Sequence, residues 1–169
     1  MPQDHIHRTG PVLPKQYPVK LTGGVKVNDI EAGTLVALET NGGVEQLVPA
    51  TAWAWTTDET ITSDAFALKF AGVAGGRSNK DVPTDTRDHS ILVAQDGEFE
   101  VLVTAGTYQA GSFLKPNKAA GNALLNSCKA TTDLSTAIFC VSETSLAGAT
   151  RVRAYILKTA PKRMNNTNA

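Results

Sequence analysis

The sequence has few of the residues on which catalytic and metal-binding sites most often depend. Of its 169 residues, two are cysteines, three are histidines and 6% are aromatic. Two cysteines cannot build a disulfide framework, so we expect Cys128 and Cys140 to be free thiols. No apolar run approaches the roughly 18 residues of a membrane-spanning helix. Residues 1–8 lack the apolar middle of a signal peptide, which predicts assembly in the cytosol without membrane contact.

The composition that is present favours one folded, strand-rich domain. Apolar residues make up 41% of the chain and charged residues 19%, as in folded proteins rather than disordered ones. The chain is long enough to bury a core. Ala, Thr, Val and Gly are abundant, and this mixture favours strands and tight turns over helices.

Charge is balanced overall but is not evenly distributed. Residues 1–26 carry four basic residues against Asp4, and residues 151–169 carry five basic residues and no acid. The residues between them hold fifteen acidic and seven basic side chains. Basic ends on an acidic body suit an acidic protein surface, including that of a sister copy. The basic residues are scattered without interleaved aromatics, so we expect no direct contact with nucleic acid.

Proline, glycine and apolar patterning predict an all-β barrel or sandwich. Prolines 2, 11, 14 and 18 predict an irregular N-terminal arm. Asn41-Gly42-Gly43 predicts a hairpin turn, and the alternation over residues 51–62 predicts a strand. Asp96-Gly97 and the glycines that follow it predict a hairpin over residues 96–116. The expected organisation is an arm over residues 1–26, a barrel-like core over 27–158 and a basic tail over 159–169, with one helical candidate at 117–125 and a long polar loop at 77–90.

Residue patterns that could carry chemistry are incomplete. His5 and His7 beside Asp4 could begin a zinc site, but further ligands would have to come from distant segments. Asp88-His89 could form a dyad, but no nucleophile motif accompanies it. Glu98 and Glu100 alternate with apolar residues, which predicts the solvent face of a strand rather than an acid–base pair. We expect no catalytic residue, no metal and no cofactor, and hence no enzyme.

Trp53 and Trp55 lie two residues apart, on the same side of the predicted strand. Such a pair can pack in a core, line a protein interface or form a platform for a glycan ligand. The sequence leaves all three alternatives open. The glycan alternative would make the chain a binding module for a glycan-bearing surface.

Four segments carry a resemblance to a known family. They are "IEAGTLVALETNGG" (30–43), "AFALKFAGVAGG" (65–76), "DGEFEVLVTAG" (96–106) and "QAGSFLKPNKAAG" (109–121). In this order they resemble the small capsid decoration, or cement, proteins of tailed bacteriophages. The resemblance covers roughly residues 30–157 and implies a β-barrel-like, or β-tulip, domain on the outer face of the phage head. It further implies a homotrimer, with a dimer as the alternative, that bridges major capsid protein subunits and stabilises the shell.

The two basic ends and the polar loop lie largely outside the matched segments, and we predict contacts to the capsid or to sister subunits there. We expect removal of residues 1–20 to abolish binding to the shell and leave the domain folded. The residues predicted at this interface are His5, His7, Arg8, Val12, Leu13, Tyr17, Arg77, Lys80, Arg87, Arg151, Arg153, Lys162 and Arg163.

Overall fold

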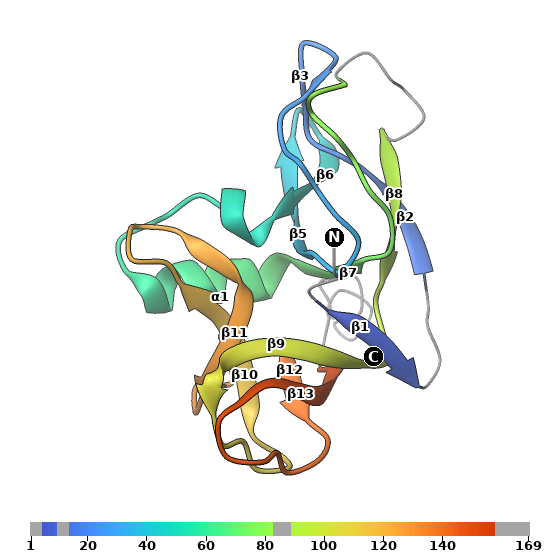
Figure 1. Cartoon of the computed structure of the whole chain (residues 1–169). Helices are drawn as coiled ribbons and strands as arrows, with labels where there is room; N and C mark the ends of the chain where they lie inside the picture. Colours follow the sequence, from blue (N-terminus) through green and yellow to red (C-terminus); the bar gives the residue numbers. More distant parts are fainter. Residues whose placement is uncertain (1–4, 10–13, 83–88, 158–169) are drawn as a thin grey trace, which may run out of the picture.

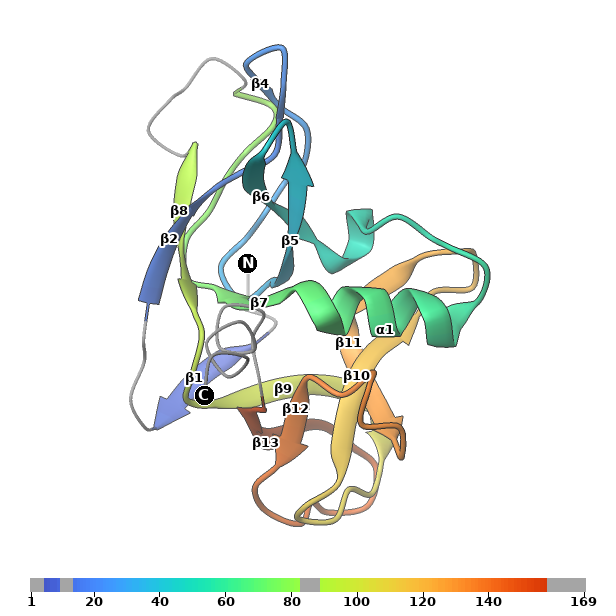
Figure 2. The ribbon, with the colours of Figure 1, turned by 180° about the vertical axis from the view of Figure 1, so that it is seen from behind.

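The computed structural model describes residues 5–9, 14–82 and 89–157, and it confirms the predicted all-β class (Figure 1). The strands form two lobes, with one α-helix beside their junction when the molecule is seen from either side (Figure 2). The lower lobe contains β1 (Ile6–Thr9), β9 (Glu98–Gly106), β10 (Phe113–Lys118), β11 (Leu124–Thr131), β12 (Phe139–Val141) and β13 (Ala149–Ile156). The upper lobe contains β2 (Pro14–Pro18), β3 (Leu21–Thr22), β4 (Val25–Lys26), β5 (Leu35–Asn41), β6 (Val44–Pro49), β7 (Phe70–Ala74) and β8 (Ser90–Ala94).

The lower sheet closes on itself as a five-stranded barrel. Its strands follow the order β9-β11-β10-β12-β13, and β13 returns to pair with β9. That closing pair is antiparallel and runs from Ala149 opposite Gly106 to Tyr155 opposite Glu98. Strand β1 adds to the other edge of β9, where His7 lies opposite Phe99. Closure places each of these five strands between two others, so none of them is an edge strand.

The upper sheet also curls until its two edge strands meet. Its order is β2-β8-β7-β5-β6. Just after β2, Val19 bridges Leu47 of β6, and the Lys20 amide donates to the Leu47 carbonyl over 3.3 Å. The apolar side chains enclosed by this lobe form their own core: Tyr17, Val19, Ile30, Val36, Leu38, Leu47, Ala71, Ala74, Ile91 and Val93.

Strands β5 and β7 form a wall that both cores share. In β5, Leu35 and Ala37 belong to the core of the barrel and helix, whereas Val36 and Leu38 belong to the upper core. Both faces of the strand are therefore buried, which explains its continuous apolar run in place of an alternating pattern.

The helix α1 (Glu59–Lys69) begins within residues 51–62, for which the sequence predicted a strand. Asp58 caps it, since its carboxylate accepts from the Ile61 amide over 2.9 Å. Phe66 is fully buried and makes an edge-to-face contact with Trp53, with ring centroids 5.5 Å apart. The prediction of a helix at 117–125 is wrong, because this segment contains the end of β10 and the start of β11, where Lys118 lies opposite Leu124.

The expected irregular arm is also wrong for the part of it that the structure describes. Strand β2 pairs with β8 along its whole length, from Pro14 opposite Ala94 to Pro18 opposite Ser90. Its prolines are compatible with pairing because β2 is an edge strand, where a missing N–H donor is tolerated. The N-terminal segment is therefore part of both lobes.

The two predicted hairpins have different outcomes. The turn at Asn41–Val44 joins β5 to β6 as predicted, with φ of 57° at Gly42 and 80° at Gly43. By contrast, residues 96–116 are not a hairpin, because β9 pairs with neither β8 before it nor β10 after it. The bend at Gly97 instead takes the chain from the upper sheet to the barrel.

Candidate interaction surface

Two of the predicted interface residues, His5 and Tyr17, are buried inside the fold. The His5 side chain is 2% exposed; its Nε2 donates to the Asn126 carbonyl over 2.7 Å, and its Nδ1 accepts from the Leu102 amide over 3.2 Å. The Tyr17 hydroxyl accepts a hydrogen bond from the Gln95 side-chain amide over 2.8 Å. Both side chains therefore hold strands together and do not offer a surface to a partner in this conformation.

Other predicted interface residues lie at or beyond the edge of what the structure describes. His7 and Arg8 lie on β1. Val12, Leu13, Arg87, Lys162 and Arg163 lie outside the described residues. The interface role of all these residues stays a prediction.

Arg77 and Lys80 lie on the surface of the upper lobe. The Arg77 guanidinium is 3.1 Å from Glu31, and the Lys80 ammonium is 3.5 Å from Asp29. Their segment is fixed by the bridge between Ile30 and Ser78, with backbone hydrogen bonds of 2.9 and 2.8 Å. The side chains of Arg77 and Lys80 are 62% and 51% exposed, so each ion pair contributes little to stability.

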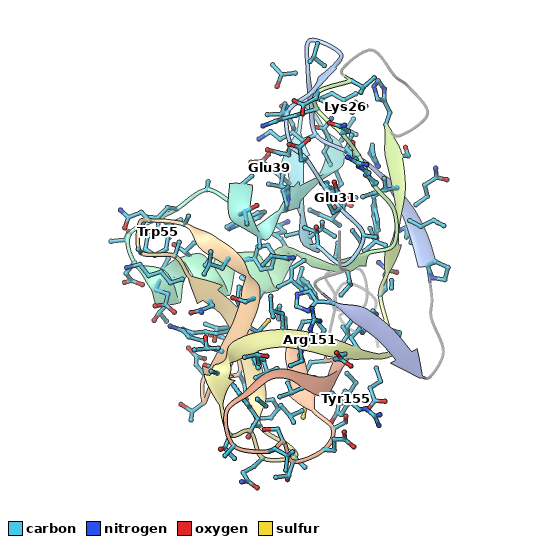
Figure 3. The ribbon with its side chains drawn as sticks, viewed as in Figure 1. Lys26, Glu31, Glu39, Trp55, Arg151 and Tyr155 are labelled. Atoms are coloured by element: carbon cyan, nitrogen blue, oxygen red, sulfur yellow. The ribbon has the colours of Figure 1, made fainter. Side chains whose placement is uncertain are left out.

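Arg151 and Arg153 lie on the lower lobe, away from Arg77 and Lys80 (Figure 3, where Glu31 marks the upper lobe and Arg151 the lower). They alternate along β13 with buried residues such as Val152 and Ala154, so they share the outer face of the barrel. Arg151 Nε lies 3.8 Å from Glu100, and Arg153 Nε lies 3.4 Å from Glu143.

Tyr155 continues this outer face and is 45% exposed. It lies opposite Cys140 on β12, and a side-chain hydrogen bond with Cys140 raises the pKa of the Tyr155 hydroxyl. The hydroxyl is therefore protonated at neutral pH, and the exposed ring offers an apolar face to a partner.

The loop between β12 and β13 adds the most exposed large apolar side chain described, Leu146, which is 86% exposed. Hydrogen bonds to the loop after β9 fix its position: the Ser145 amide donates to the Tyr108 carbonyl over 2.8 Å, and the Ala110 amide donates to the Thr144 hydroxyl over 3.1 Å. Beside it is a cavity of about 300 Å³ that Leu146 lines together with Arg151 and Arg153. We call the surface formed by Glu143, Leu146, Arg151, Arg153 and Tyr155 the β13 face.

The other side chains that the sequence suggested for catalysis either contact neighbouring side chains of the fold or lie outside the described residues. Asp88, the proposed partner of His89, is not among the described residues. Glu98 accepts a hydrogen bond from the Ser142 hydroxyl, and Glu100 pairs with Arg151. Over the described residues there is no group of three or more His, Cys, Asp or Glu side chains placed to hold a metal ion.

The two cysteines and the two tryptophans have distinct environments. Cys128 and Cys140 are buried free thiols, as predicted, and burial raises the pKa of Cys128. Trp53 packs against the core, whereas Trp55 is half-buried with the Lys118 ammonium 5.2 Å from its ring centroid. The two rings therefore do not form one platform. In the part of the chain described, no helix is long and apolar enough to cross a membrane.

Comparisons with known proteins give little further information. No family model matches the chain, and no curated protein matches it. Among solved structures, the head fiber gp8.5 N base of bacteriophage phi29 is similar over 88% of this chain and 97% of that chain, with a TM-score of 0.44 and 14% sequence identity.

Proposed function

We propose that this chain is a structural protein of a bacteriophage virion that binds the outer face of the head as a decoration, or cement, protein. Its partner would be the major capsid protein, whose neighbouring subunits it would bridge, and the chain would act as a homotrimer. The observation that carries the proposal is the β13 face, together with the resemblance in the sequence. The segments of that resemblance contribute β5, β7, β9 and β10, strands on which both lobes are built.

The β13 face has the properties of a docking surface. Tyr and Arg are enriched where protein interfaces gain most of their energy, and Tyr155, Arg153 and Leu146 are all prominently exposed here. The face lies on a closed barrel and a hydrogen-bonded loop, so binding would cost little ordering entropy. Because a cement protein binds many equivalent positions and several subunits at once, modest contacts would add up through effective concentration.

We further propose that the chain has no catalytic activity and no direct nucleic-acid contact. Several side chains that could have served chemistry already have structural partners: His5 joins strands, Glu100 pairs with Arg151, and Glu98 accepts from Ser142. A purely structural role requires no chemistry from these side chains beyond the contacts that they already make.

The proposal can be tested on purified, expanded heads that lack the protein. The full chain is expected to bind these heads saturably and to raise the temperature at which they rupture. Leu146→Ala combined with Tyr155→Ala should raise the Kd for the heads about tenfold or more, equivalent to about 1.4 kcal/mol, and so lower occupancy at subsaturating concentrations. Leu134→Ala is the matched control, because Leu134 is also an exposed leucine, at 62%, but lies on the loop between β11 and β12. Equal occupancy by the double variant, or no binding by the full chain, would contradict the proposal.

A further inference from the structure

A second surface of the barrel has the features of a ligand site, and it does not include the β13 face. It is an open cavity of about 770 Å³ on the outer side of the β10–β11 hairpin. In the barrel, β12 lies between β10 and β13, and β9 lies between β11 and β13. The hairpin therefore does not contact β13 by strand pairing. The side chains that line it and can contact a ligand are Ser112, Phe113, Lys115, Lys129, Thr131 and Thr132.

Two lysines face each other at the base of this cavity. Lys115 and Lys129 are directly opposite in the register of β10 and β11, an arrangement that repels unless an anion lies between them. Glu59, the first residue of α1, supplies that anion: its Oε1 lies 3.3 Å from Lys115 Nζ and 2.5 Å from Lys129 Nζ. The helix therefore places one carboxylate against the two lysines.

One carboxylate does not neutralise two ammonium groups. Burial alone would raise the pKa of Glu59, but hydrogen bonds and charge interactions with Lys129 and Lys115 outweigh burial and lower its pKa. Glu59 is therefore ionised at neutral pH, and the three side chains together carry one excess positive charge. Each ammonium has three donors, so it retains donors beyond the one directed at Glu59. The nearby Asp133 carboxylate, which accepts from the Ser135 amide and hydroxyl over 2.9 and 2.8 Å, also interacts electrostatically with Lys115 and offsets part of this excess charge.

The rest of the lining combines hydroxyl groups with one aromatic ring. Ser112, Thr131 and Thr132 place hydroxyls around the cavity, and each hydroxyl can both donate and accept. Phe113 lies opposite Thr131 and is half-buried, so part of its side chain remains accessible. Cavities of this size that combine an aromatic side chain with a few converging polar groups are typical small-molecule sites.

We propose that this cavity binds a sugar that carries a carboxylate, such as a uronic acid. The excess charge of the lysine pair would hold the carboxylate, the hydroxyl side chains would exchange hydrogen bonds with the sugar hydroxyls, and Phe113 would contact an apolar face of the ring. This binding goes beyond the shell attachment proposed above and uses a different side of the barrel. It also gives glycan recognition a place other than the two tryptophans.

The test is a titration of the full chain with methyl glucuronide and, separately, with methyl glucoside, followed by amide chemical shifts in NMR. The expected result is saturable binding of the glucuronide at millimolar concentrations, with shifts concentrated in residues 112–115 and 129–132, and at least tenfold weaker binding of the glucoside. Lys129→Gln should weaken glucuronide binding about tenfold, because it removes one positive charge from the site. The variant should still fold, because Lys115 still pairs with Glu59. Phe113→Leu keeps an apolar side chain but removes the ring, and should weaken binding severalfold.

The control variant is Lys80→Gln, which removes an exposed lysine from the upper lobe and should leave binding unchanged. No glucuronide shift, or equal binding of the glucoside, would overturn the proposal. Acetate or a short polyglutamate peptide that binds as tightly as the glucuronide would also overturn it, because the site would then recognise only a carboxylate. Head occupancy by Lys129→Gln should equal that of the unmodified chain, so failure of sugar binding and failure of shell binding are distinguishable.

Discussion

Replacing His5 by alanine tests how the N-terminal segment is attached to the barrel. His5 joins β9 and β11 through its two ring nitrogens, and the roles of those nitrogens define one tautomer: Nε2 carries the proton and Nδ1 accepts. Alanine leaves the Leu102 amide and the Asn126 carbonyl without this partner in a site where the side chain is 2% exposed. An unsatisfied buried group costs about 1–3 kcal/mol, so two such groups cost about 3 kcal/mol even if one is partly solvated.

That loss is a large fraction of the roughly 5–15 kcal/mol by which a domain is stable. Urea denaturation followed by tryptophan fluorescence measures it, because Trp53 packs against Phe66 in the core. Two further variants separate the two hydrogen bonds. His5→Asn keeps an acceptor near the position of Nδ1, and His5→Gln keeps a donor near that of Nε2, so each should recover about half of the loss. Val44→Ala, at a side chain that is 51% exposed, is the control. A change below about 0.5 kcal/mol for His5→Ala would refute this reasoning.

Three further perturbations test other parts of the structure. Gly72→Ala should lower the free energy of unfolding by more than about 2 kcal/mol in urea denaturation, because φ at this position is +139° and the new Cβ would lie 2.0 Å from the Ala94 carbonyl oxygen. Gly121→Ala is the control and should cause no such loss, because a Cβ there would have no atom within 4 Å. Equal effects of the two substitutions would contradict this prediction. The lowered pKa of Glu59 stabilises the fold above the unfolded value of 4.5, and this contribution is lost as pH falls through the folded value. Glu59→Gln should therefore lower Tm by about 2–4 °C at pH 7 and less at pH 3, and a loss that does not depend on pH would count against the ion pairs. Deletion of residues 1–18, which removes β1 and β2, should abolish cooperative unfolding in circular dichroism, and an unchanged transition would restore the idea of a dispensable arm.

The features predictable from sequence were those that depend on neighbouring residues. Asn41-Gly42-Gly43 identifies its turn because positive φ is a local requirement. The pairing of β9 with β1 and β13 was not predictable, because these two strands lie far from β9 in the chain and nothing local selects them. The same cause hid the role of His5, whose partners Leu102 and Asn126 are 97 and 121 positions away.

The helix was missed because its buried side is only partly apolar. Thr62 and Ser63 are buried alongside Phe66 and Ala67, so the apolar spacing typical of an amphipathic helix is weak. Trp53 and Trp55 also imitate strand alternation just before the Asp58 cap. At the β13 face, the alternation of Arg151 and Arg153 was visible in the sequence, whereas the exposure of Leu146 depends on hydrogen bonds between two loops.

The closing pair between β9 and β13 also has a consequence for synthesis of the chain. A ribosome releases residues in order, so β9 emerges about forty residues before the strand that seals the barrel. During that interval, the edge of β9 that later pairs with β13 has unpaired backbone N–H and C=O groups. Such exposed strand edges favour aggregation. Glu98 and Glu100 alternate with the apolar side chains of β9. Their negative charge opposes self-association of β9 before β13 pairs with it. The barrel therefore cannot close until β13 has been synthesised.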